Sequence, residues 1–144
     1  MKIIVQRVTN TSVTIDKKLY NEIKQGMLVL VGFTEGDNQE NIDYLVKKLI
    51  NLRIFDDEAG VMNKSILDIK GEILSISQFT LYADTSGGNR PSYINALGKE
   101  EATILYDKFN KKLNEFLPTK DGIFGAEMQI NSINDGPVTI ILEK

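Results

Sequence analysis

Residues 71–84 read GEILSISQFTLYAD, and residues 85–91 continue with TSGGNRP. The first part is an apolar run of strand length that ends in Ser77, Gln78, Phe79 and Thr80. A glycine-rich loop follows from Ser86. In α/β proteins a ligand is commonly held where a rigid buried strand ends and a loop begins. We therefore expect the functional site at the end of this strand.

Apolar and alternating runs predict the other strands. Residues 26–33 are apolar without a break, which is typical of a central strand with both faces covered. The alternating segment 12–16 is expected to pair with 2–8, with a turn at Lys17 and Lys18. Further strands are expected at 52–55, 122–130 and 138–142.

Two segments have helical spacing. Asp37 followed by Glu40 resembles a capping box, and apolar residues from Ile42 to Ile50 recur at helical intervals. A second helix is expected from about residue 99 to 117, because Pro118 cannot continue it. The order of elements predicts an α/β fold. It would have mixed, largely antiparallel, barrel-like β layers with two long helices packed outside, in a single domain over residues 1–144.

Composition narrows the chemistry. The 144 residues include no cysteine and no histidine, which excludes cysteine nucleophiles, Ser-His dyads and His/Cys zinc sites. We read Asp56, Asp57 and Glu58 as a solvated turn, and we expect no metal and no cofactor. No run approaches the length of a membrane span and the start lacks a signal-peptide pattern, so we expect a cytoplasmic protein without a membrane partner.

Each candidate site residue has a structural alternative. Strand alternation would put Ser77 and Phe79 on one side and Gln78 and Thr80 on the other, but these polar groups could simply satisfy neighbouring backbone. Phe124 and Met128 could be core residues. Arg7 could be a surface residue or a clamp on a turn carbonyl. The segment 134–137 reads as a β-turn, or as a functional Gly136-Pro137 peptide in cis or trans.

Several motifs together resemble one family. They are Val5 to Val8, Asn51 to Phe55, Ser77 to Asp84, Asn89 to Tyr93, Phe124 to Met128, and Asn134 to Thr139. In this order they resemble the D-aminoacyl-tRNA deacylases, also called D-tyrosyl-tRNA(Tyr) deacylases, across essentially the whole chain. Tyr93 stands where that family is expected to carry Phe.

The resemblance implies a homodimeric hydrolase that cleaves the ester between a D-amino acid and the terminal adenosine of tRNA. It implies a cis Gly136-Pro137 peptide that enters the partner's pocket and rejects L-amino acids, with Arg7 helping to hold it. It also implies that the substrate is surrounded by Ser77, Gln78, Phe79, Ala96, Phe124 and Met128. Thr80 matches the residue proposed in that family as nucleophile, a disputed role.

The residues themselves favour attack by water. A threonine hydroxyl is a poor nucleophile without a base, and this chain has no histidine to act as one. The substrate that the resemblance implies is an activated ester with a neighbouring ribose hydroxyl, so the protein would mainly orient it. Backbone amides near Phe79 and Thr80 could stabilise the oxyanion.

The net charge of −3 argues against a surface that coats nucleic acid, so we expect no DNA partner and only a local grip on the tRNA acceptor end. Arg90, Lys99, Lys111 and Lys112 are candidate phosphate contacts. Two other functions stay open. One is a small esterase or amidase acting on free D-amino acid derivatives, and the other is a dimeric adenosine-binding module without catalysis.

Overall fold

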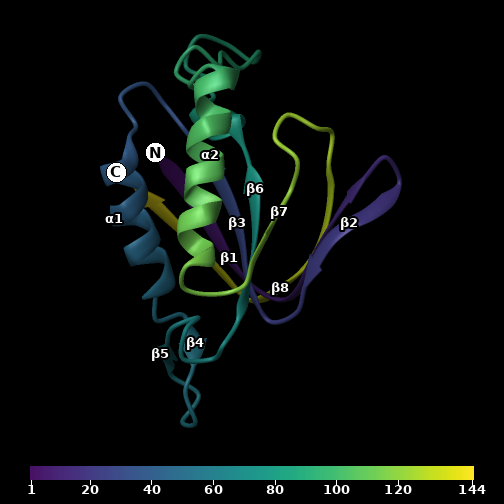
Figure 1. Cartoon of the computed structure of the whole chain (residues 1–144), viewed down its shortest axis with the longest axis vertical. Helices are drawn as coiled ribbons and strands as arrows, with labels where there is room; N and C mark the ends of the chain where they lie inside the picture. The colour runs from purple at the N-terminus through teal and green to yellow at the C-terminus, as the bar shows by residue number, and fades with distance from the viewer.

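The long strand β1, Lys2–Ile15, is the axis of the sheet. In the computed structural model, which describes residues 1–144, β1 pairs antiparallel with β2 (Lys18–Ile23), β3 (Gly26–Gly32) and β8 (Gln129–Glu143). The apolar strand β6 (Glu72–Ser77) lies parallel to β3, and β7 (Thr119–Asp121) lies parallel to β6. The sheet order is therefore β2-β1-β3-β6-β7, with β8 on β1 (Figure 1).

Side chains of β2 and β7 bring the two ends of this order together. Asn21 Nδ2 donates to the carbonyl oxygen of Asp121, and Lys120 Nζ donates to that of Glu22, both at 2.7 Å. The sheet is thus curved into a nearly closed, barrel-like form. The predicted fold class, a mixed and largely antiparallel sheet with two long helices outside it, is confirmed.

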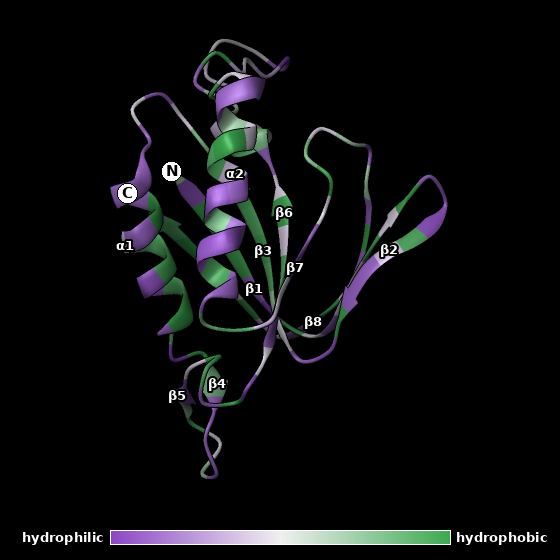
Figure 2. Ribbon diagram, in the orientation of Figure 1, coloured by the Kyte–Doolittle hydropathy of each residue, from purple (hydrophilic) through white to green (hydrophobic).

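Helices α1 (Gln39–Ile50) and α2 (Lys99–Asn114) cover one face of the sheet (Figure 1). Their hydrophobic residues face the sheet and their hydrophilic residues face outward (Figure 2). The remaining elements are short: β4 (Phe55–Asp56) pairs with β5 (Met62–Lys64), and the 3₁₀ turn η1 (Phe79–Tyr82) follows β6. None of the helices has the length and apolar character needed to cross a membrane.

The sheet buries a core on each face. The larger core packs the helices against β1, β3 and β6 and includes Val29, Leu45 and Phe109. The smaller core fills the concave face and includes Val13, Leu28 and Ile76, with Met128 and Ile130 packed against it. β6 therefore contributes to both cores, through Ile73 to the larger one and through Leu74 and Ile76 to the smaller one.

The N-terminal half differs from the sequence prediction in two places. Segments 2–8 and 12–16 are not partners in a hairpin but halves of the single strand β1, and the turn lies at Asp16 and Lys17, where φ is 50° and 62°. The cap of α1 is Asn38, which forms a capping box with Asn41; Asp37 instead accepts a hydrogen bond from Thr34 N at 2.8 Å.

Later segments differ as well. The predicted strand 52–55 is shifted, because only Phe55 and Asp56 pair. The predicted strand 122–130 is mostly a loop, and β8 begins at Gln129. Residues 134–137 do not separate two strands but lie inside β8. There the register passes from Gln6↔Thr139 to Val8↔Asn134, which leaves residues 135–138 bulged opposite Arg7.

Candidate functional site

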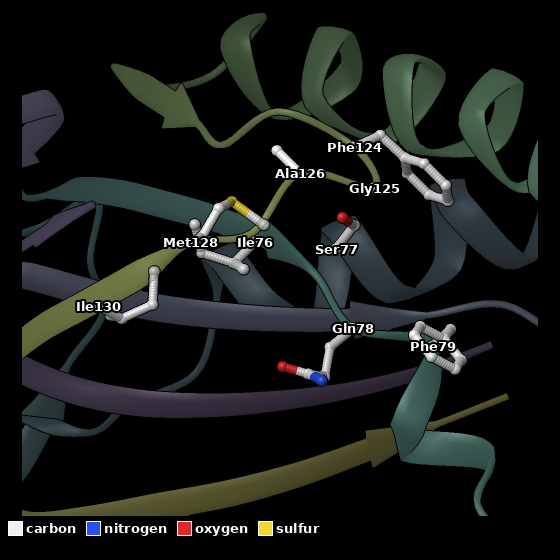
Figure 3. Close-up of a pocket in the computed structure, with 9 residues that line it drawn as sticks. All are labelled: Ile76, Ser77, Gln78, Phe79, Phe124, Gly125, Ala126, Met128 and Ile130. Atoms are coloured by element: carbon white, nitrogen blue, oxygen red, sulfur yellow. The ribbon is translucent and has the colours of Figure 1, made fainter. Parts of the chain in front are cut away.

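A cavity of about 280 Å³ opens between the end of β6 and the loop that joins β7 to β8 (Figure 3). Five of the predicted site residues line it: Ser77, Gln78, Phe79, Phe124 and Met128. Ile76, Gly125, Ala126 and Ile130 complete the lining. The structure thus brings together two segments that are separated by more than forty positions in the sequence, which is the arrangement that a binding site on this fold needs.

The β6 side of the cavity is rigid. Ser77 is the last strand residue and is paired with Val31, and Gln78 N donates to Val31 O at 2.7 Å. Ser77 lies beneath the loop that carries Phe124 and Ala126 (Figure 3). The predicted alternation of side chains stops here, because the chain bends into η1 instead of continuing as a strand.

The bend leaves two backbone donors outside the turn's own hydrogen bonds. The first of those bonds runs from Leu81 N to Gln78 O at 3.2 Å. The N–H groups of Phe79 and Thr80 precede it, so no carbonyl of the turn can accept from them. Since Phe79 also lines the cavity, this segment can present an N–H donor close to a bound carbonyl oxygen.

Thr80 is placed differently from its neighbours. Its hydroxyl accepts a hydrogen bond from the side-chain amide of Gln78, and it does not line the cavity in this chain. An amide NH₂ is a donor and cannot remove the hydroxyl proton. This contact therefore orients the threonine hydroxyl without making it more nucleophilic.

The opposite wall is supported by Tyr106 of α2. Its ring centroid lies 5.8 Å from that of Phe124, and its hydroxyl donates to the carbonyl oxygen of Ser75 at 2.8 Å. Burial raises the pKa of Tyr106, so its hydroxyl keeps its proton and remains a donor. Sequence reasoning placed Tyr106 only on the core face of the helix. The sequence did offer one indication of this role: a tyrosine on the core face of a helix has a hydroxyl that needs a buried hydrogen-bond partner.

Gly122 is a second supporting residue that the sequence did not reveal. Its N–H donates to the same Ser75 carbonyl at 3.0 Å. A Cβ at this position would come within 2.5 Å of Met128 Sδ and 3.1 Å of Ile76 Cδ1. The missing side chain therefore makes the room in which Met128 lines the cavity.

Near the cavity mouth, Phe79 and Tyr93 make an edge-to-face contact with ring centroids 5.0 Å apart. A bridge between Asp84 and Ser92 closes the base of the exposed glycine-rich loop. Ala96 lies in a neighbouring hollow with Thr34 and Glu35 and does not line the main cavity. The aromatic pair therefore forms an exposed platform beside the opening.

The segment around Gly136 lies elsewhere. The Gly136–Pro137 peptide bond is cis, and both residues are exposed. Arg7 Nε reaches the carbonyl oxygen of Asp135 at 3.3 Å and its carboxylate Oδ2 at 3.1 Å. Nη1 of the same side chain donates to Ile54 O at 2.7 Å. Arg7 thus fixes the base of the bulge.

The cavity and the bulge lie apart from each other in the folded chain. Arg7 is level with Met27 on β3, whereas Ser77 is level with Val31. Four residues along a strand span about 13 Å, so the levels of Arg7 and Ser77 lie about that far apart along the strands. Gly136 and Pro137 therefore do not line the cavity of their own chain.

The site is built from hydroxyl, amide, aromatic and backbone groups. No three carboxylate, histidine or cysteine side chains group in a way that could hold a metal ion. Such a site can bind an aromatic or apolar ligand, order polar atoms and stabilise a developing negative charge through N–H donors.

Two solved structures share the fold of this chain over nearly its whole length. A solved structure titled "c-Myc DNA Unwinding Element Binding Protein" is 42% identical, with a TM-score of 0.95 over 100% of this chain and 99% of that one. A probable eukaryotic D-amino acid tRNA deacylase shares the fold, with a TM-score of 0.83 at 16% identity over 98% of this chain and 97% of that one.

The sequence profile of the family described as D-Tyr-tRNA(Tyr) deacylase matches residues 4–143, which is nearly the full length. This match covers both walls of the cavity and the Gly136–Pro137 bulge. The chain therefore belongs to the D-Tyr-tRNA(Tyr) deacylase family and is a hydrolase that acts on D-aminoacyl-tRNA.

Proposed function

We propose that this protein hydrolyses the ester between a D-amino acid and the 3′-terminal adenosine of tRNA, in the cytoplasm, as a chiral proofreading step that spares L-aminoacyl-tRNA. The observation that carries the proposal is the cavity at the end of β6. Phe79, Phe124 and Met128 give it aromatic and apolar surface for a base or side chain, and Ser77 and Gln78 give it polar groups for a ribose or amino group.

In this proposal a water molecule attacks the ester. The N–H of Phe79, alone or with that of Thr80, would donate to the oxyanion of the tetrahedral intermediate. One such donor is worth about 3–4 kcal/mol in the transition state. The adjacent ribose hydroxyl of the substrate would help to position the water. The Gln78 contact to Thr80 supports this route, because it supplies no base for an acyl-enzyme.

Rejection of L-amino acids would need a second chain. We place Gly136 and Pro137 of one protomer in the cavity of its partner, where their carbonyl oxygens would crowd the side of the α-carbon that carries an L side chain. The exposure of both residues and their distance from their own cavity support this assignment. The outer edge of β8 is unpaired and exposes Ile133 and Ile141, which suits a homodimer contact.

Exclusion of this kind has a consequence for glycine. Glycine has no side chain to clash with the bulge, so glycyl-tRNA should also be cleaved. Hydrolysis of D-aminoacyl-tRNA with no cleavage of glycyl-tRNA at high enzyme concentration would contradict rejection by exclusion.

The decisive experiment compares D-tyrosyl-tRNA and L-tyrosyl-tRNA with the purified protein and no added metal. We expect rapid loss of the D ester alone. Loss of both esters would remove the chiral role of Gly136 and Pro137, and loss of neither would favour a binding module. A free D-tyrosine ester, tested in parallel, should turn over much more slowly, and equal rates would favour a small esterase.

A further inference from the structure

A second hollow is lined by residues of α1 and of the segment that follows it. Figure 1 shows this end of α1, from which the chain continues to β4 and β5. The hollow has a volume of about 620 Å³ and is lined by Tyr44, Lys47, Lys48, Asn51, Leu52 and Arg53. We call these six residues the α1 groove. Three of them are cations and none is a carboxylate, although the whole chain carries a net charge of −3.

The cations of the α1 groove are not used in ion pairs. All salt bridges of the structure involve other residues, so Lys47, Lys48 and Arg53 have no carboxylate within 4.0 Å. Arg53 Nε donates to Asn63 O at 3.0 Å, which orients the guanidinium through only one of its five N–H groups. Lys48 Nζ lies 5.8 Å from the centre of the Tyr44 ring. The groove therefore offers positive charge that forms no ion pair with a carboxylate of the chain.

Helix stability explains only part of this arrangement. Lysines in the last turn of a helix interact favourably with its carbonyl end, which accounts for Lys47 and Lys48. This interaction with the helix end does not account for Arg53, which lies beyond the helix, or for the hollow between the three cations. Concentrated unpaired cations on an acidic protein indicate a local anion partner.

The position of the groove suggests which anion. Arg53 is followed by Ile54, whose carbonyl accepts the 2.7 Å hydrogen bond from Arg7, and Arg7 also holds Asp135. The groove thus begins one residue from the contacts that fix the Gly136–Pro137 bulge. If this bulge enters the partner's cavity, the α1 groove of one protomer lies near the nucleic acid whose 3′ end is bound by the other.

We propose that the α1 groove binds the phosphodiester backbone of the tRNA acceptor stem while the partner's cavity holds the terminal adenosine. The inference rests on the proposed function, which it extends from the 3′ end to the stem. A planar guanidinium can contact a phosphate through two hydrogen bonds, and the two lysines supply point charges nearby. Such contacts position the tRNA without reading its sequence.

The test is the salt dependence of binding to uncharged tRNA. Two variants are compared with the wild type: Lys47→Gln/Lys48→Gln and the triple variant that adds Arg53→Gln. The slope of log K against log salt is negative, and each lost phosphate contact reduces its magnitude by about 0.9. We expect the magnitude of the slope to fall by about 2 in the double variant and about 3 in the triple variant. We also expect both variants to bind tRNA at least about tenfold more weakly at low salt. The double variant keeps Arg53 and its contact to Asn63, so it tests the groove even if the triple variant folds poorly.

The matched control is Lys17→Gln/Lys18→Gln at the turn between β1 and β2, which removes two adjacent exposed lysines outside the α1 groove. It should leave the slope unchanged. A slope whose magnitude falls only in the control, falls equally in the control and the groove variants, or falls in none of them would overturn the proposal.

This test is separate from the test of the reaction. Binding of uncharged tRNA involves no ester, so it can succeed or fail whatever happens to D-tyrosyl-tRNA. If the wild type hydrolyses D-tyrosyl-tRNA but the groove variants bind tRNA normally, only the groove proposal is wrong. If the groove variants lose tRNA binding but the wild type cleaves neither ester, the reaction is wrong and the groove is a tRNA contact.

Discussion

The guanidinium of Arg7 links the carbonyl oxygen of Asp135, 3.3 Å from Nε, to that of Ile54, 2.7 Å from Nη1. The side chain is only 8% exposed, so little water can replace it at either oxygen. One residue of β1 therefore joins two segments that lie about eighty positions apart in the sequence and fixes the base of the exposed bulge.

Replacement of Arg7 by lysine should separate charge from geometry. Lysine keeps the positive charge but cannot span both carbonyl oxygens. We expect Arg7→Lys to lower the free energy of unfolding by about 1–3 kcal/mol, because a buried carbonyl loses its donor, and to raise the rate on L-tyrosyl-tRNA. Urea unfolding and paired D and L assays check this. Lys24→Arg, at an exposed position, is the control and should match the wild type. Unchanged stability and selectivity in Arg7→Lys would show that charge alone suffices.

Gly136 should not tolerate a side chain. Its φ is +119°, which residues with a Cβ rarely adopt, and a Cβ would lie 2.7 Å from Val138 Cγ2 and 2.9 Å from Val138 N. We expect Gly136→Ala to cost about 1–3 kcal/mol in unfolding free energy and to weaken discrimination against L-tyrosyl-tRNA. Gly87→Ala is the matched control, because nothing lies within 4 Å of a Cβ there. Equal behaviour of the two variants would contradict a constrained bulge.

Thr80 should be dispensable for bond cleavage. Its hydroxyl accepts from the Gln78 amide and has no base beside it, so we expect Thr80→Ala to keep activity within about tenfold of the wild type. Single-turnover hydrolysis of D-tyrosyl-tRNA measures the effect, and Thr80→Ser controls for the lost methyl group. An acyl group trapped on Thr80 by rapid quench and mass spectrometry would refute attack by water.

Tyr106 should make stability fall at alkaline pH. Burial raises its pKa in the folded state, whereas a tyrosine in the unfolded chain ionises near pH 10. Above that pH the unfolded state loses a proton that the folded state retains, so its contribution to stability is lost progressively up to the raised pKa, at up to about 1.4 kcal/mol per pH unit. Tyr106→Phe should flatten this decline in urea titrations at several pH values.

The matched control for that measurement is Tyr20→Phe, at an exposed position of β2. It should leave the alkaline decline as steep as in the wild type. Tyr106→Phe should also be about 1 kcal/mol less stable at neutral pH, because Ser75 O keeps only its bond from Gly122. If the alkaline loss of stability is equally steep in the wild type, Tyr106→Phe and Tyr20→Phe, groups other than Tyr106 cause it.

The elements that were predicted correctly carry a strong local pattern. The apolar spacing of α1 and the unbroken apolar run of β3 each allow one packing arrangement, and both form where expected. The turn interpretation of 134–137, one of the two given for that segment, and the pairing of 2–8 with 12–16 were wrong for the opposite reason. Their composition favours turns, but pairing of β1 with β8 along both strands outweighs that local preference.

The residues of the site also divide into those that local sequence patterns reveal and those that depend on tertiary contacts. Ser77, Gln78 and Phe79 are adjacent and end a buried strand, so local reasoning found their wall of the cavity. The sequence pattern alone does not show that Phe124 and Met128 form the other wall, because this depends on Tyr106 and on the space left by Gly122. The α1 groove was also missed, since Lys47 and Lys48 look like the ordinary wet side of a helix.

The separation of the cavity from the bulge has a consequence for mixed dimers: two different defective chains should complement each other. If the bulge serves a neighbouring chain, a protomer with a defective cavity still has a sound bulge, and a Gly136→Ala protomer still has a sound cavity. A mixed dimer of the two would pair one intact cavity with one intact bulge. Two preparations that are each unable to select D esters should then regain selectivity after subunit exchange, up to half of the native sites in each mixed dimer.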